Sequence, residues 1–185
     1  MRRLLLCTAL LAAAGTVFAQ DSAQPAAKPA PASPKATATG KVGDKNVAII
    51  YSSPRVKGRE GHVYTTDGLI AKANGSQYPI WRAGANAATT LMTEGDIMLG
   101  DVQVPPGNYT LFVDITDPDN WVLIVNKKTG EWGLSHDGSA DLGKVKMEMS
   151  KPSSMVEELK YTIADGKITL AWENKQASVP ISAPK

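Results

Sequence analysis

The chain has 185 residues, and its 20 Lys and Arg nearly balance its 18 Asp and Glu. Two of the basic residues precede an N-terminal apolar run; without them the basic count is 20 − 2 = 18, equal to the acidic count. A neutral chain lacks the uniformly basic surface that binds nucleic acid, so we expect no nucleic-acid partner and only a local basic site.

Residues 1–19 have the pattern of a signal peptide. Two arginines precede an apolar run, residues 4–17, that is too short to span a bilayer, and residues 17–19 form a small-residue cleavage site. Cys7 lies inside the apolar run rather than at its end, which argues against a lipoprotein. We therefore expect cleavage after Ala19 and an exported protein, periplasmic or secreted, with no cysteine and no integral membrane segment.

Residues 20–44 are rich in Ala, Pro, Lys, Ser and Thr and contain almost no large apolar side chain. This composition buries too little surface to order itself, so it predicts a disordered linker that acts as a spacer. Residues 45–182 have the usual size of one domain. Without disulfides, that domain must be stabilised by a hydrophobic core or a bound ligand.

The region after the linker is predicted to be all-β. No window after residue 40 shows sustained helical periodicity, whereas period-two alternation recurs between turn signals. The pattern predicts about eight or nine short strands in a single antiparallel β-sandwich. The segments that carry it are residues 46–51, 88–93, 96–104, 108–115, 121–126, 144–149 and 157–174.

The stretch YSSPRVKGRE, residues 51–60, has a cation at every second position: Arg55, Lys57 and Arg59. On an extended strand these side chains would project from one face. Two explanations remain open. Pro54 favours an edge strand, where charges prevent edge-to-edge aggregation. Alternatively, the cations hold a carboxylate, sulfate or phosphate, which the planar fork of arginine suits.

The stretch YPIWRAGANAATT places Trp81 and Arg82 before a turn that contains Gly84 and Asn86. Glycine and asparagine tolerate left-handed backbone, so both fit a tight turn. A guanidinium beside an indole, among small residues, could form a shallow site for an anion or a sugar. Alternatively, Arg82 is a structural tie to a carboxylate such as Asp114.

Two later segments give specific strand predictions. The run at residues 121–126 is apolar on both faces, as in the middle of a covered sheet. A two-residue turn at residues 165–166 predicts a hairpin. Its register pairs Ile163 with Ile168, Tyr161 with Leu170, and Leu159 with Trp172.

The chain has two histidines, His62 and His136, and we expect no metal and no cofactor. Zinc needs three or four convergent ligands, and the mature chain has no cysteine. Ser135, His136 and Asp137 are neighbours, which cannot face one another as a catalytic triad, so a surface loop is expected there. The acidic residues after His136 only partly match a calcium loop.

Five blocks, SSPRVKGR, WRAGANAATT, PPGNYTLF, WVLIVNK and EWG, occur in this order over most of residues 46–173. Together they resemble a bacterial exported family catalogued as domain of unknown function 2911. The resemblance implies an exported β-rich domain and brings no activity or ligand with it. Between Arg59 and Trp81 the chain departs from the family's short aromatic segment.

The leading hypothesis is a non-enzymatic exported β-sandwich that binds an anionic small molecule, a glycan or an envelope protein. Charge would come from Arg55, Lys57, Arg59 and Arg82, with Trp81 and Asn86 shaping the site. One alternative is an envelope hydrolase for a small substrate, with Asp, Glu or His as acid and base. Another is an accessory domain whose motifs are purely structural.

Overall fold

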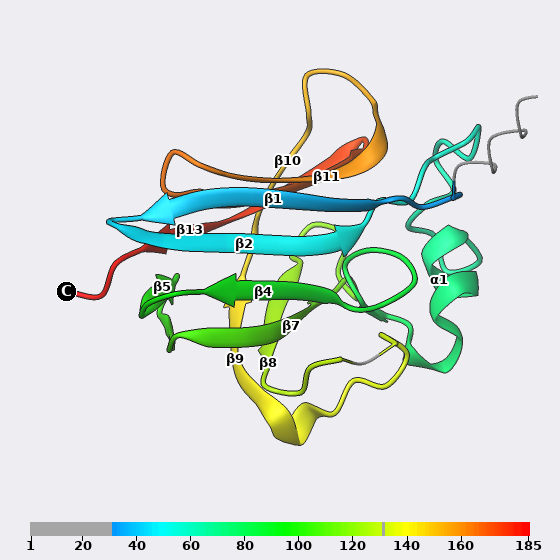
Figure 1. Ribbon diagram of the computed structural model, residues 1–185. Helices are drawn as coiled ribbons and strands as arrows, with labels where there is room; N and C mark the ends of the chain where they lie inside the picture. The colour runs from blue at the N-terminus through cyan, green and yellow to red at the C-terminus, as the bar shows by residue number, and fades with distance from the viewer. Residues whose placement is uncertain (1–30, 131) are drawn as a thin grey trace, which may run out of the picture.

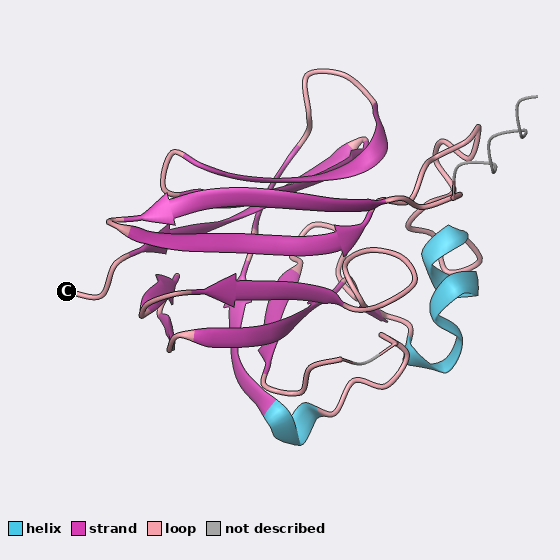
Figure 2. Cartoon of the chain, viewed as in Figure 1, coloured by secondary structure: helices cyan, strands magenta, loops and turns pink. Residues whose placement is uncertain are grey.

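The computed structural model describes residues 31–130 and 132–185, and Figure 2 shows that they are mostly strand. The strands are β1 (Lys35–Val42), β2 (Lys45–Ser52), β3 (Ile80–Trp81), β4 (Thr89–Thr93), β5 (Ile97–Leu99), β6 (Val102–Val104), β7 (Gly107–Asp114), β8 (Val122–Asn126), β9 (Asp141–Lys146), β10 (Glu148–Ser150), β11 (Val156–Ala164), β12 (Lys167–Glu173) and β13 (Lys175–Ser182). The helical segments are α1 (Leu69–Asn74), η1 (Gly75–Gln77) and η2 (Gly138–Ala140). None of the described helices is long and apolar enough to cross a membrane.

The strands form two antiparallel sheets that pack face to face (Figure 1). The first sheet has the order β1-β2-β4-β7-β8-β9, with β3 beside β7. The second has the order β11-β12-β13-β5-β6, with β10 beside β13. The predicted all-β sandwich is therefore confirmed.

Alternating side chains fill the space between the sheets, as the sequence pattern predicts. On β7, Tyr109, Leu111 and Val113 are buried in the core, and Ile115 continues this face. Strand β8 lies between β7 and β9, so its predicted central position is confirmed. The outer face of the sheet is covered here as well. Phe112 on the neighbouring strand β7 contacts the ring of His136, which lies in the loop between β8 and β9.

The hairpin of β11 and β12 has the predicted register for most of its length. Tyr161 lies opposite Leu170 and Ile163 opposite Ile168. The predicted pair of Leu159 and Trp172 falls in a register shift between Val156 and Lys160. There β11 also bonds to the loop after β2, and Leu159 N donates to Pro54 O at 3.0 Å. A third segment occupying this edge accounts for the irregularity.

The folded domain begins earlier than the sequence predicted. Residues 35–42, placed in the linker, form β1 and pair along their whole length with β2. Ala38 and Val42 are buried, so small side chains suffice where a strand joins an existing core. Gly40 leaves room for Ile163 of β11, which lies against β1. The predicted signal peptide and residues 20–30 of the linker lie outside the described residues.

The described residues contain more strands than the eight or nine expected. Four of them, β3, β5, β6 and β10, have only two or three residues, too few to show a period. The single strand expected over 144–149 is divided between the sheets as β9 and β10. Several long connecting loops and α1 lie at the end of the sandwich opposite the C-terminus (Figure 1).

Candidate functional site

A pocket of about 430 Å³ opens at this end of the sandwich. Its lining includes all six residues that the sequence singles out: Arg55, Lys57, Arg59, Trp81, Arg82 and Asn86. Three more side chains, which sequence reasoning missed, complete it: Trp132, Leu134 and Trp172. These residues come from four separate segments of the chain, which only the tertiary fold brings together.

The three cations of residues 51–60 reach the pocket by a route that the sequence did not predict. Strand β2 ends at Ser52, and the backbone then turns, with φ of 50° at Lys57 and 71° at Gly58. The expected single-faced strand is therefore wrong, because Gly58 permits a left-handed turn there. The loop is fixed to β11 instead, and Val56 N donates to Glu157 O at 2.9 Å.

Each cation of this loop has a different environment. Arg55 forms an ion pair with Glu158 at 2.6 Å, between side chains that are both more than a third exposed. Arg59 donates to the backbone oxygens of Val56 and Arg55 at 2.9 and 2.8 Å, which closes its own loop. Among the described residues, Lys57 Nζ has no carboxylate within 4.0 Å, so its charge is available to a ligand.

Arg82 is buried, with 5% of its surface exposed, and its hydrogen bonds go to neutral oxygens. Nη1 donates to Asn86 O at 2.8 Å and to Trp132 O at 3.3 Å. Nη2 donates to Ala73 O at 2.7 Å and, with Nε, to the Asn74 Oδ1 atom at 3.3 and 3.4 Å. A guanidinium has five N–H donors, so all of them are used.

The suggested tie between Arg82 and Asp114 is wrong, because Asp114 instead accepts from Thr116. Burial lowers the pKa of the Arg82 guanidinium, since the charged form loses hydration. Arg82 thus joins three pieces of chain around the pocket and contributes charge without a free N–H group.

Trp81 and Trp172 form an aromatic floor beneath the pocket. Their rings stack with centroids 5.9 Å apart and planes 22° from parallel. Trp81 Nε1 donates to Gly84 O at 3.0 Å, within the predicted turn. Asn86 has φ of 59°, in the left-handed region expected of it, and its Nδ2 donates to Ser33 O at 3.4 Å.

The segment between β8 and β9 supplies the outer wall of the pocket, with Trp132 64% and Leu134 40% exposed. From the sequence, the Trp-Gly pair at residues 132–133 could have indicated an exposed indole in a loop. Gly133 has φ of 86°, in the left-handed region that favours glycine. The packing of Gly133 is close, because a Cβ there would lie 2.8 Å from Arg82 Cδ. The loop that carries Trp132 can therefore pack against Arg82 only because residue 133 is a glycine.

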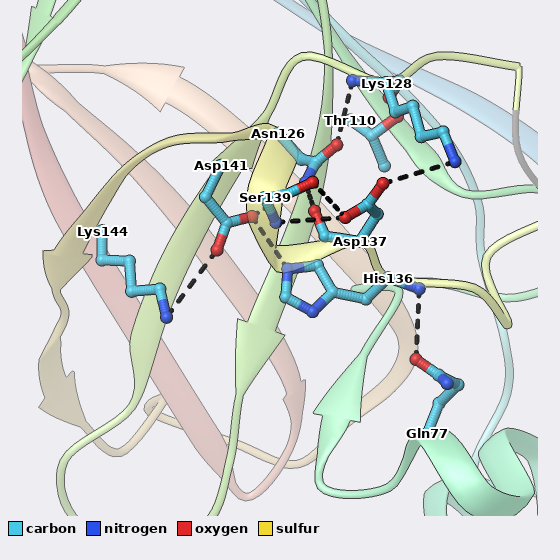
Figure 3. A network of polar contacts seen from close by, with 9 residues as sticks. All are labelled: Gln77, Thr110, Asn126, Lys128, His136, Asp137, Ser139, Asp141 and Lys144. Carbon is cyan, nitrogen blue, oxygen red and sulfur yellow. Dashed lines mark hydrogen bonds and ion pairs between the residues drawn. The ribbon is translucent and has the colours of Figure 1, made fainter.

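A polar network fixes the same segment to the sheet (Figure 3). His136 Nε2 lies 2.8 Å from Asp141 Oδ1, which also accepts from Asn126 Nδ2 at 2.8 Å. The His136 side chain is only 12% exposed, so the expected surface position is wrong for its ring. The ring packs on Phe112 because the apolar outer face of β7 must be covered.

The described part of the lining contains no carboxylate and no imidazole. His62 and His136 are both outside it, so neither shares the pocket with Arg82. Among the described residues there is also no group of three or more His, Cys, Asp or Glu side chains that could hold a metal ion. The described lining therefore combines positive charge and aromatic surface, and none of its side chains is a general base.

Residues 33–181 match the family model described as "Protein of unknown function (DUF2911)". No curated protein and no solved structure matches the chain. The matched region covers most of the chain and begins two residues before β1. It includes every pocket residue discussed above, and the chain belongs to this DUF2911 family.

Proposed function

We propose that this chain is an exported binding domain whose pocket takes an anion, either a small molecule or an acidic group of a glycan or envelope protein. One observation carries the proposal. Four cationic side chains line one pocket, and the described part of that lining contains no acidic side chain. Gathering like charges is unfavourable, so such a pocket favours an anionic occupant.

The signal-peptide pattern of residues 1–19 supports export. The pocket itself supports binding rather than hydrolysis, because its described lining has no acid or base to activate water. Two of the four cations, Arg59 and Arg82, are committed to backbone oxygens. Arg55 is paired with Glu158 through Nη2, so direct contacts would come mainly from Lys57 and from the rest of the Arg55 guanidinium.

Titration calorimetry with sulfated and uronic-acid oligosaccharides and with phosphate esters tests the proposal. The double variant Arg55→Gln/Lys57→Gln should bind the anion about tenfold more weakly, because two charge-assisted contacts are lost. The matched control is Lys146→Gln/Lys160→Gln, which removes two exposed cations outside the pocket. Equal affinities for the two double variants, or no heat with any anion, would overturn the proposal.

A further inference from the structure

We infer that the ligand is an amphipathic anion, in which an acceptor-rich acidic head is joined to an apolar ring. The inference rests on the proposed function and narrows it. An anion-binding pocket could equally bind inorganic ions or sugars. The lining of this pocket indicates which class of ligand it suits. Three features of that lining carry the argument: its donor excess, its unpartnered N–H groups and its apolar wall.

The polar side chains of the lining are almost all donors. Arginine, lysine and tryptophan side chains can donate hydrogen bonds and cannot accept them. Only Ser33 and Asn86 offer a side-chain acceptor in the described lining. The hydroxyl groups of a neutral sugar need acceptors as well as donors, and few are present. A carboxylate, sulfate or phosphate, which only accepts, matches this composition.

Two N–H groups of the lining residues are buried without a partner among the described residues: Arg55 Nε and Trp172 Nε1. Their segments are adjacent, because Arg55 pairs with Glu158 of β11, and β11 pairs with β12, which carries Trp172. A buried donor without an acceptor is costly and uncommon in native proteins. Each atom exposes less than 1 Å² of surface, so an acidic head reaches it only when the side chains above it shift, and the oxygen atoms of that head would then supply the missing acceptors.

The remaining wall is apolar and presents an unusually exposed ring. Trp132 and Leu134 stand at the rim, and Leu69, Ile70 and Ala73 continue the wall from α1. Trp132 is the most exposed large apolar side chain that the structure describes. A hydrated inorganic ion would leave this surface in water, whereas a ring stacked on the indole would bury it. The volume of about 430 Å³ admits such a ligand.

Matched probes separate the two halves of the ligand. 2-Naphthoate has a ring and a charge, acetate has the charge alone, and 2-naphthalenemethanol has the ring alone. We expect naphthoate to bind at least about tenfold more tightly than either partial probe, since only it uses both surfaces. Tryptophan fluorescence and calorimetry provide the affinities, because three of the lining side chains are indoles.

Variants then show which residues bind the ring of the ligand and which bind its charged group. Trp132→Ala should weaken naphthoate binding by about fivefold and leave acetate unchanged, because it removes only the stacking surface. Met155→Ala is the matched control, since Met155 is 48% exposed and lies outside the pocket. Arg55→Gln should weaken both anions. Trp132 is exposed, so its replacement leaves folding intact, which thermal unfolding verifies.

The outcomes distinguish this inference from the proposed function. If naphthoate binds no more tightly than acetate while Arg55→Gln weakens both, the amphipathic ligand is wrong and anion binding stands. If uronic-acid oligosaccharides bind and naphthoate does not, the inference fails in the same way. If the neutral naphthalenemethanol binds as tightly as naphthoate, charge plays no part, and both the inference and the proposed function fail.

Discussion

Arg82 is the residue on which the walls of the pocket depend. Its guanidinium donates to backbone oxygens of Ala73, Asn86 and Trp132, which belong to three different segments. A buried arginine without a carboxylate partner is stabilised only if all its donors are satisfied, as they are here. Its role is thus to hold the site together and to add a fixed positive charge beneath it.

Replacing Arg82 by methionine should destabilise the fold by on the order of 3 kcal/mol, because several buried carbonyl oxygens lose their donors at once. Urea unfolding measures this loss. Lys57→Met, which removes an exposed cation from the same pocket, should change the free energy of unfolding by no more than about 0.5 kcal/mol. Similar losses in both variants would contradict the structural role of Arg82.

The loop between β8 and β9 owes its position to contacts at Gly133 and His136. His136 fixes it to the sheet through Asp141 (Figure 3), and Gly133 lies directly against Arg82. A Cβ at Gly133 would lie 2.9 Å from Arg82 Cβ and 3.3 Å from Ala88 Cα. The loop cannot move away without exposing Phe112, so a clash at this glycine must disturb the pocket wall.

Gly133→Ala and Gly130→Ala form a matched pair on this loop. Both glycines have positive φ, of 86° and 79°, so both substitutions carry a backbone cost of about 1–2 kcal/mol. Among the described residues, and apart from the two chain neighbours, only at Gly133 does the new methyl group meet other atoms, because no such atom lies within 4 Å at Gly130. Gly133→Ala should therefore lose about 2 kcal/mol more in chemical denaturation. Equal losses would show that the loop does not pack on Arg82 as described.

The elements differ in how far the sequence predicts them. The hairpin of β11 and β12 is predicted in register because its turn and its alternation are local signals. The segment around Lys57 is not, since alternating charges resemble a strand while Gly58 imposes a turn. The gathering of Arg55, Arg82 and Trp132 depends on contacts between segments far apart in the chain, which no local pattern encodes.

At the scale of the whole molecule, the two sheets enclose aromatic side chains whose hydroxyl groups are shielded from water. Burial raises the pKa values of Tyr64 and Tyr161 well above the ordinary value of 10.0, because the phenolate would lose its hydration. Tyr161 Oη donates to Ala83 O at 3.0 Å, and its ring contacts Tyr51 edge-on. Both groups therefore couple folding to alkaline pH.

The sign of this coupling follows from the raised pKa values in the folded state. Stability is fully present below pH 10 and falls above it, because the unfolded tyrosines ionise there while the folded ones remain protonated. Two such groups should cost about 2–3 kcal/mol at pH 11. Urea unfolding from pH 9 to 11 measures the loss. The double variant Tyr64→Phe/Tyr161→Phe should show a flatter decline, and parallel curves would contradict the account.

The central claim is that the cationic pocket binds an anion, and the indole N–H signals of the tryptophans in its lining test the claim most directly. In a nitrogen–proton correlation spectrum titrated with naphthoate, the Trp172 signal should move downfield, as for a newly formed hydrogen bond, and Trp132 should shift with it. Trp121, which lies outside the pocket lining, should move least. If Trp172 and Trp132 remain unchanged at saturation, or if Trp121 shifts most, the pocket does not bind the anion as claimed.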